Sequence, residues 1–253
     1  MRFCLLASGS KGNCVWVEED GRAIIVDNGL SFVELKKRAQ SAGINLASVR
    51  DVIISHEHTD HVQGVGPAAR KLGLTVHVSQ PTAEAAGAHL KNLAIRHFEP
   101  GQTLDFGFLK VKTITGSHDC ADPSVFVVEG GRHRLGLATD LGVATALVRQ
   151  EFSGLSALIL EFNHDLQMLL SGPYPYFLKQ RVRSRKGHLS NEQAAELLHE
   201  LQHHNLQQVV LAHLSEVNNT PALALAAALA SFGQSPPPVA AASQWEPTEV
   251  FTL

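Results

Sequence analysis

The chain has 253 residues, of which 44% are hydrophobic and 18% are charged, and this composition supports a folded core and excludes extended disorder. The 24 acidic and 21 basic residues give a formal net charge of −3, so contact with nucleic acid would need a local basic patch. Three cysteines without a CxxC pair, no signal-like segment and no stretch of 18 apolar residues predict a cytoplasmic protein without a membrane span.

Short β-rich segments separated by Gly, Ser and Asp turns dominate the first quarter of the chain. A helix is predicted over 31–42, because Phe32, Leu35 and Ala39 fall on one side and Gly43 follows its end. The other elements predicted in this half are strands over 2–7, 14–17, 23–26, 51–55 and 75–78 and helices over 66–72 and 81–90.

The second half again alternates strands and helices. Ser190 and Gln193 form a capping-box pattern that predicts the start of a helix. The Ala/Leu-rich helix predicted over 221–231 is compatible with a core position or with a homodimer face. The predicted strands are 108–115, 124–129, 134–138, 156–160 and 208–212. We expect a single α/β domain over residues 1–253, for which a four-layer α/β/β/α arrangement is one compatible architecture.

Histidine is frequent, with 14 residues, and four ligand-type side chains follow the predicted strand 51–55 within six positions: His56, His58, Asp60 and His61. In an extended loop, alternate side chains point the same way, so His56 and His58 can bind one ion while Asp60 and His61 face a second position. Nitrogen and oxygen ligands of this kind suit Zn²⁺, with Mn²⁺ or Fe²⁺ as alternatives. A chance His-rich surface loop is the weaker interpretation.

Three further ligand-type residues each follow the end of a predicted strand. His118 follows 108–115, Asp140 follows 134–138 and His213 follows 208–212. Functional residues commonly lie on loops at strand ends. One such residue alone would more often be a turn residue or a helix cap, but the three together with the 56–61 cluster predict a metal site.

The motif set resembles the metallo-β-lactamase superfamily, and within it the YycJ/WalJ branch. The segments that carry the resemblance are LASGSKGN at 6–13, SHDCADP at 117–123, EFNHD at 161–165, KGHLSN at 186–191 and LSEVNN at 214–219. The resemblance implies a metallo-β-lactamase αββα sandwich that binds two divalent metal ions.

The resemblance also implies a role for each matching residue. His56, His58 and His118 would bind one metal and Asp60, His61 and His213 the other. Asp140 would bridge the two ions, and His188 would match the mobile general-acid histidine of the family. Asp60, Asp140 and His188 are therefore the expected catalytic residues.

Spacing distinguishes this chain from other branches of the superfamily. The 73 residues between Asp140 and His213 leave no room for the inserted domain of β-CASP nucleases, and the short stretch between His118 and Asp140 leaves none for the tRNA-binding arm of ribonuclease Z. Ribonuclease Z carries a Glu three residues before the bridging Asp, where this chain has Leu137. Glu161 and His164 are therefore the two candidates for a residue that supports and orients His188.

A basic segment directly precedes His188. Its five cations are Lys179, Arg181, Arg183, Arg185 and Lys186. They predict either a clamp for a phosphate backbone or a solvated helix face, and the position next to His188 favours the clamp. Three aromatic residues, Tyr174, Tyr176 and Phe177, come just before this segment. Packing in the core or in a lid is the favoured interpretation for them, with base stacking as the alternative.

These observations favour a dinuclear metal-dependent phosphodiesterase with DNA as its partner. The resemblance implies a five-prime-to-three-prime exonuclease on double-stranded DNA. One alternative is a small-molecule hydrolase of the same fold that cleaves a cyclic phosphodiester, lactone or thioester. The other is a non-enzymatic metal-binding regulatory protein, which would be expected to lack a ligand, whereas this sequence has all seven.

Overall fold

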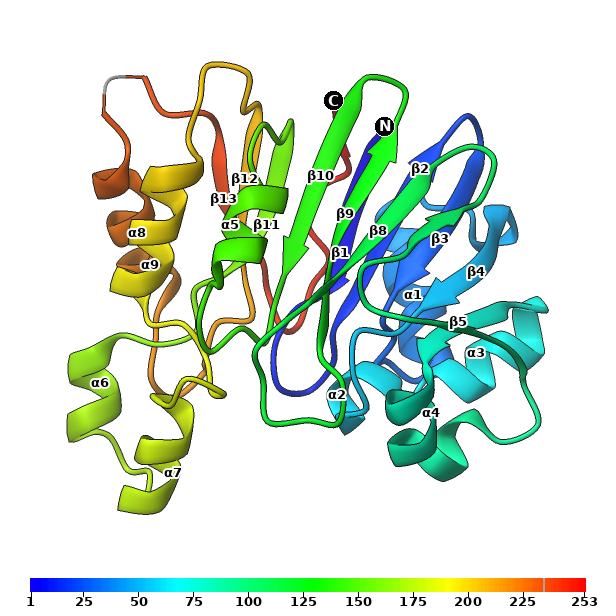
Figure 1. The fold of residues 1–253 in the computed structure, drawn as a ribbon, viewed down its shortest axis with the longest axis horizontal. Coiled ribbons are helices and arrows are strands. Elements are labelled where there is room, and N and C mark those ends of the chain that lie inside the picture. The colour runs from blue at the N-terminus through cyan, green and yellow to red at the C-terminus, as the bar shows by residue number, and fades with distance from the viewer. Residues whose placement is uncertain (234) are drawn as a thin grey trace.

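The computed structural model describes residues 1–233 and 235–253. In these ranges the chain forms two seven-stranded β-sheets with helices on their outer faces (Figure 1). None of the helices in the described ranges is both long and apolar enough to cross a lipid bilayer.

The first sheet has the strand order β14-β1-β2-β3-β4-β5-β6. Strands β3 to β6 are parallel, so helical crossovers must connect them. The strands are β1 (Arg2–Ala7), β2 (Cys14–Glu19), β3 (Arg22–Val26), β4 (Val49–Ile53), β5 (Thr75–Ser79), β6 (Ala94–Phe98) and β14 (Phe251–Thr252). The crossovers contain α1 (Phe32–Ser41), η1 (Leu46–Ser48), α2 (Thr59–Val62), α3 (Val65–Leu72), α4 (Gln80–Ala86) and η2 (Gly87–Leu90).

The second sheet has the order β13-β12-β11-β10-β9-β8-β7. Strands β10 to β13 are parallel, whereas β9 is antiparallel to both β8 and β10. The strands are β7 (Thr103–Asp105), β8 (Lys110–Thr115), β9 (Ser124–Gly130), β10 (His133–Ala138), β11 (Ala157–Glu161), β12 (Gln208–Ala212) and β13 (Val239–Ala241). The helices are α5 (Ala146–Glu151), α6 (Leu166–Ser171), α7 (Tyr176–Val182), α8 (Asn191–Leu201) and α9 (Pro221–Ser231).

Three apolar clusters fill the spaces between the four layers and hold them together. Alternate residues of β1 point to opposite faces, so Phe3 and Leu5 join a cluster between the sheets that also contains Phe126. Cys4 and Leu6 pack in a second cluster with residues of α1 and α3, and a third cluster lies between the second sheet and α5, α8 and α9. Strands buried on both faces need nearly continuous apolar sequence, and full burial of one such side chain contributes about 1.5–3 kcal/mol. The predicted four-layer αββα architecture is confirmed.

Elements with strong local signals lie where the sequence predicts them. β12 and α9 match the predicted ranges, and α8 begins with the predicted capping box, in which Ser190 Oγ accepts from Gln193 N at 3.3 Å and Gln193 Oε1 accepts from Ser190 N at 3.0 Å. α9 packs its small residues against the core, whereas Leu223 and Leu229 are 40% and 47% exposed. The core interpretation therefore holds for one face of α9, and the homodimer stays a prediction for the other.

Two local predictions are wrong. The helix predicted over 81–90 stops at Ala86, because Gly87 adopts a φ of +52°, and a 3-10 turn follows. The loop that carries the 56–61 cluster is not extended throughout, since it becomes helical at Thr59. Several short elements, among them β6, β7 and α5 to α7, are absent from the predictions because they lack a long apolar period.

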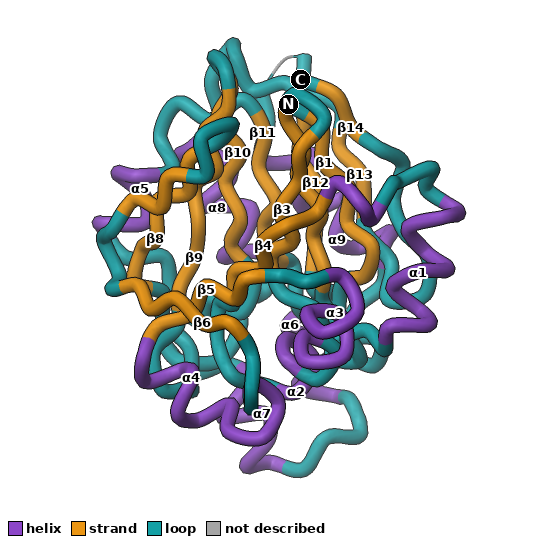
Figure 2. The backbone as a smooth tube through the Cα atoms, turned by 90° about the vertical axis from the view of Figure 1, so that its right-hand side faces the viewer, coloured by secondary structure: helices purple, strands orange, loops and turns teal. Residues whose placement is uncertain are grey.

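Helices α2 and α7 lie at one end of the sandwich, and both chain termini lie at the other end (Figures 1 and 2). The strands that precede the predicted ligands have their carboxyl ends near α2 and α7. The fold thus gathers the loops after these strands at a single end.

Candidate metal centre

Strand direction brings the predicted ligands together. His118, Asp140 and His213 follow β8, β10 and β12, and Glu161 is the last residue of β11. These four strands run in one direction, since β10 to β12 are parallel and β8 and β10 are both antiparallel to β9. Their carboxyl ends therefore share one sheet edge, which faces the 56–61 segment after β4.

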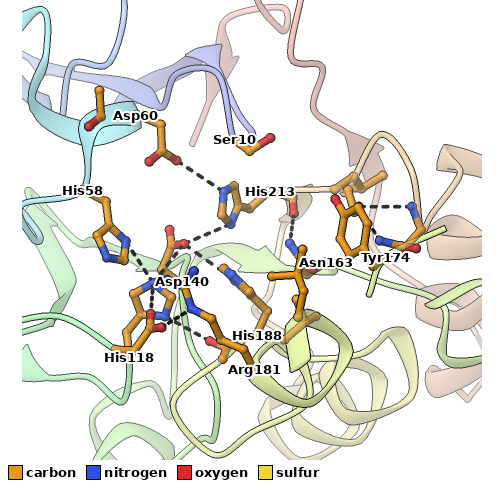
Figure 3. Close-up of a pocket in the computed structure, with 18 residues that line it drawn as sticks. Ser10, His58, Asp60, His118, Asp140, Asn163, Tyr174, Arg181, His188 and His213 are labelled. Carbon is orange, nitrogen blue, oxygen red and sulfur yellow. Dashed lines mark hydrogen bonds and ion pairs between the residues drawn. The ribbon is translucent and has the colours of Figure 1, made fainter. Parts of the chain in front are cut away.

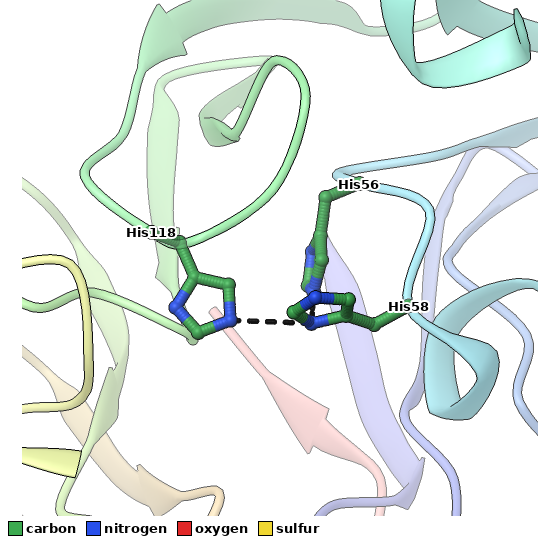
Figure 4. A group of neighbouring side chains, drawn as sticks. All are labelled: His56, His58 and His118. Carbon is green, nitrogen blue, oxygen red and sulfur yellow. Dashed lines mark hydrogen bonds between the residues drawn. The ribbon is translucent and has the colours of Figure 1, made fainter. Parts of the chain in front are cut away.

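His56, His58 and His118 form the first group of nitrogen donors (Figure 4). His58 Nδ1 lies 3.1 Å from His56 Nε2 and 3.3 Å from His118 Nε2. His118 Nδ1 donates to the carbonyl oxygen of Gly187 at 3.0 Å. That hydrogen bond fixes the tautomer that leaves Nε2 unprotonated, which is the form that binds a metal.

Asp60, His61 and His213 form a second group. Asp60 Oδ2 lies 3.4 Å from His61 Nε2 and 3.7 Å from His213 Nε2. The other ring nitrogen of each histidine faces a buried carboxylate: His61 Nδ1 lies 2.8 Å from Asp27 Oδ2, and His213 Nδ1 lies 3.0 Å from Glu161 Oε1. These carboxylates turn both Nε2 atoms toward Asp60.

Asp140 lies between the two groups (Figure 3). Its Oδ2 is 3.0 Å from His61 Nε2, and its Oδ1 is 3.7 Å from His118 Nε2 and 3.3 Å from His213 Nδ1. The structure therefore places the predicted bridging carboxylate within reach of donors from both groups.

The donor set fits a pair of divalent cations. Asp140 Oδ2 and His213 Nε2 are buried and have ion-pair contacts, to His61 and Asp60, but no well-aligned hydrogen bond among the described residues, and a buried polar atom without a hydrogen bond is costly. Imidazole nitrogens and carboxylate oxygens in this arrangement are the ligands that Zn²⁺ accepts, and Mn²⁺ and Fe²⁺ use the same types. The identity of the metal stays a prediction.

Neighbouring charges in the cluster shift the pKa values of its members. Burial alone would raise the pKa of Asp140, but the charges of His213 and His61 lower it well below its usual range. Burial alone would lower the pKa of His213, but the negative charge of Asp140 and the contacts with the Asp60 and Glu161 carboxylates raise it to about 10. Ionised carboxylates are thus held in place, and metal binding would release the protons of the histidines.

His188 is held by Glu161. Its Nδ1 lies 2.7 Å from Glu161 Oε1, the oxygen that also contacts His213. The second oxygen, Oε2, accepts from the backbone N–H groups of Leu141 and Leu189 at 2.9 and 3.2 Å. Burial would lower the pKa of His188, but the charge of Glu161 raises it. Of the two predicted supporting residues, Glu161 is therefore the one in contact with His188.

His164 serves a different purpose. Its backbone pairs with Ser190 and accepts from Asn191 N at 2.8 Å, which links the loop after β11 to the start of α8. The side chain is buried, its Nδ1 has no partner among the described residues, and burial lowers its pKa to about 4. The prediction that His164 supports His188 directly finds no contact to sustain it in the described part of the chain.

A cavity of about 420 Å³ opens over the centre. It is lined by His58, Asp60, His118, Asp140, His188 and His213, and by Tyr174 and Arg181 from the α7 region. Arg181 forms an ion pair with Asp119, next to His118. Among the five predicted cations, Arg181 alone lines this cavity, while Arg183, Arg185 and Lys186 are exposed beside it and Lys179 donates to Leu170 O.

The aromatic residues before the basic segment are not packed in the core. Tyr176 and Phe177 are 76% and 72% exposed, and Tyr174 is half-buried at the cavity wall. The favoured packing interpretation is thus wrong for Tyr176 and Phe177. They lie in the first turn of α7, the helix that also carries the cavity-lining residues Leu178, Arg181 and Val182.

Three residues of the centre are not among those predicted from the sequence. Asp27 supports His61, Asn13 Nδ2 donates to Asp60 Oδ2 at 3.0 Å and lies 2.9 Å from His61 Nε2, and Asp119 binds Arg181. Asp27 directly follows β3, so the rule of ligand-type residues after strand ends could have found it. Asn13 carries no such signal, because it reaches the centre through the turn after β1.

An αββα sandwich with a His/Asp cluster at one end defines the metallo-β-lactamase class of fold. The family model "Beta-lactamase superfamily domain" matches residues 22–214. The chain belongs to the metallo-β-lactamase superfamily, as the motifs predict.

The similar proteins include two named nucleases. The chain is 34% identical to Exodeoxyribonuclease YycJ of Bacillus anthracis, over 88% of this chain and 86% of the relative. It is 32% identical to Exodeoxyribonuclease WalJ of Streptococcus pneumoniae, over 88% and 85%. Among solved structures, the metallo-β-lactamase fold protein YhfI from Bacillus subtilis superposes with a TM-score of 0.74 at 16% identity over 98% of each chain, which is a likeness of fold.

Proposed function

We propose that this chain is a metal-dependent phosphodiesterase of the cytoplasm that acts on DNA, as a five-prime-to-three-prime exodeoxyribonuclease on double-stranded substrate. The observation that carries the proposal is the cavity in which the predicted ligands meet His188. The names of the relatives YycJ and WalJ support an exodeoxyribonuclease, and the polarity is what the resemblance of the sequence motifs to that branch implies.

Two groups of residues would hold the two ions. His56, His58 and His118 would hold one, Asp60, His61 and His213 would hold the other, and Asp140 would contact both. Two bound divalent cations supply charge stabilisation for a phosphoryl group and lower the pKa of water to the neutral range.

His188 is proposed as the general acid. It is half-buried at the cavity wall, and Glu161 fixes its Nδ1 so that Nε2 is the ring nitrogen left to face a substrate. The charge of Glu161 raises the pKa of His188, which favours the protonated imidazole that a donor to the departing sugar oxygen requires. Glu161 contacts His188 and two backbone amides, so we assign it a positioning role.

The basic segment supplies the contact with the phosphate backbone in this proposal. Arg181 lines the cavity, and Arg183, Arg185 and Lys186 follow it in the chain with exposed side chains. Several exposed cations in the segment next to His188 suit a polyanionic strand better than a small substrate.

The direct test uses the protein reconstituted separately with Zn²⁺, Mn²⁺ and Fe²⁺. Each form is incubated with end-labelled double-stranded and single-stranded DNA, RNA and a small chromogenic phosphodiester, with Asp140→Ala as the inactive control. Stepwise release of nucleotides from the five-prime end of duplex DNA is the expected result. Hydrolysis of the chromogenic ester alone would favour the small-molecule hydrolase, and two bound ions without any hydrolysis would favour the regulatory protein.

A further inference from the structure

Two adjacent aromatic side chains project into solvent next to the candidate metal centre. Tyr176 and Phe177 are 76% and 72% exposed and occupy the first turn of α7. An aromatic side chain can bury about 150–250 Å², so an exposed pair leaves a large apolar area without a partner among the described residues. Neighbouring helical residues point about 100° apart, so the two rings together cover one corner of the helix.

Helix α7, which carries the two rings, is attached to the wall of the cavity. Leu178, Arg181 and Val182 of α7 line the cavity. The helix end is fixed as well, because His188 N donates to Val182 O at 2.9 Å and a side chain at Gly187 would meet that carbonyl oxygen at 2.2 Å. Phe177 precedes Arg181 by four residues, which puts both on one face of the helix about 6 Å apart along its axis. At about 3.4 Å per nucleotide in a stacked strand, this rise corresponds to about two bases.

The helix that carries the pair and the segment directly after it are rich in cations. Lys179, Arg183, Arg185 and Lys186 have no ion-pair partner in the described ranges, and Arg181 pairs with Asp119. The chain as a whole has a net charge of −3, so this positive surface is local. Rings flanked by unpaired cations are the combination with which proteins bind single-stranded nucleic acid: bases stack on the rings, and the cations follow the backbone.

Other occupants fit the surface less well. A membrane-bound helix needs a continuous apolar face, but α7 has seven residues, and its aliphatic Leu178 and Val182 point to the cavity. A protein partner would have to accept four unpaired cations around two rings. An intact duplex offers phosphates to the cations but hides its bases from the rings.

We propose that Tyr176 and Phe177 form a stacking platform for unpaired bases of the nucleic-acid strand whose phosphodiester lies in the cavity. This inference rests on the proposed nuclease function and deepens it, because it implies that the enzyme engages a frayed or single-stranded end. The terminal one or two bases stack on the rings, while Arg181 and its neighbours contact the phosphates.

The test uses binding as well as activity. A single-stranded oligonucleotide with 2-aminopurine at its end is titrated onto metal-loaded protein in the His188→Ala background, where cleavage is suppressed. Tyr176→Ala with Phe177→Ala is compared with Tyr176→Phe with Phe177→Tyr, which keeps both rings, and with Val33→Ala, an equally exposed apolar residue on α1. The alanine pair should bind about tenfold to a hundredfold more weakly and lose the fluorescence quenching that stacking causes. The other two variants should match their parent.

With His188 intact, the alanine pair should cleave DNA more slowly yet hydrolyse a small chromogenic phosphodiester at the wild-type rate. Unchanged affinity and quenching in the alanine pair, while the parent binds and the wild type cleaves DNA, would overturn the stacking platform alone. Loss of self-association or of binding to anionic lipid vesicles, with DNA binding intact, would also overturn it. A wild-type protein that neither binds nor cleaves nucleic acid would overturn the proposed function itself.

Discussion

Three residues of the candidate metal centre have backbone conformations that are rare for residues with side chains. Asp27, Asp140 and His213 have φ values of +56°, +55° and +53°. Asp and His tolerate this left-handed region better than most residues, but each instance still costs of order 1–3 kcal/mol. Asp27 and His213 directly follow a strand and Asp140 comes two residues after one, and the sharp change of direction aims each side chain at the centre. The surrounding sheets must therefore supply the stability that keeps these residues in place.

The role of His188 can be separated from metal binding. His188 clusters with Asp140, Glu161 and His213 but belongs to neither proposed ligand group. His188→Ala should therefore retain two metal ions per chain and lose about 10²–10⁴-fold in the rate of DNA cleavage. Elemental analysis and cleavage kinetics measure the two effects. On a p-nitrophenyl phosphodiester the defect should shrink, since that leaving group needs little protonation. Loss of metal, or an equal defect on both substrates, would contradict the general-acid role.

The contact between Glu161 and His188 predicts a change in pH dependence. The protonated imidazole is the active form, so the rate should fall as the pH rises through the pKa of His188. Glu161→Gln removes the negative charge that raises this pKa, so the falling limb of the kcat profile should move to lower pH. Exposed Glu84 on α4 provides the control substitution, Glu84→Gln. A profile that keeps its alkaline limb in Glu161→Gln would exclude this positioning role.

At the scale of elements, α7 and the segment after it connect the basic surface with the centre. Gly187 makes this possible, because a side chain there would come within 2.3 Å of the Arg181 carbonyl oxygen and 2.2 Å of that of Val182. The carbonyl oxygen of Gly187 also accepts from His118. One close approach of the backbone thus positions the helix, a predicted metal ligand and the predicted acid together.

The basic segment should produce a salt-dependent affinity for DNA. Each phosphate contact contributes a slope of about −0.9 in log K against log salt on duplex DNA. Arg183→Gln with Arg185→Gln removes two exposed cations and should flatten that slope by up to about two units, while hydrolysis of a small chromogenic ester stays unchanged. Binding titrations at several salt concentrations measure this slope. The control pair, Lys36→Gln with Arg50→Gln, removes exposed cations remote from α7; an equal slope in both double variants would identify the segment as a solvated face.

For the molecule as a whole, both sheets contribute to the candidate centre and share one apolar cluster. Residues after β4 of the first sheet meet residues after β8, β10 and β12 of the second, and Phe3, Val17, Val111 and Phe126 pack together between the sheets. We therefore propose that residues 1–253 form one domain, which would unfold as a unit.

Metal removal should destabilise this unit. Metal ions bind the assembled site and not the unfolded chain. A metal ion at one hundred times its dissociation constant therefore adds about 2.7 kcal/mol to the free energy of unfolding. For a chain of this size, that corresponds to about 5–10 °C in Tm. Calorimetry of chelator-treated protein, with and without added Zn²⁺ or Mn²⁺, measures the shift, and Asp140→Ala should reduce it. An unchanged Tm, or at most one ion in the loaded wild type, would rule out the two-metal centre.

The sequence determined those features whose signal lies within a few neighbouring residues. The strand 208–212, the helix 221–231 and the capping box at Ser190 follow from local patterns, and the family follows from ordered motifs. The seven ligand candidates could be named because each comes just after a strand, and the structure brings them to one place. Their assignment as ligands stays a prediction that metal analysis can test.

Only the tertiary structure decided features that depend on which distant segments meet. Local sequence did not distinguish Glu161 from His164 as the support of His188, because that contact joins the end of β11 to the loop before α8. The exposure of Tyr176 and Phe177 could not be predicted from local sequence either, since burial depends on what packs against α7 and not on the side chains themselves. Asp27 reaches His61 across 34 residues of sequence for the same reason. A pattern in the chain records the local conformation of each segment, whereas pairing and burial are set by long-range packing of the two sheets.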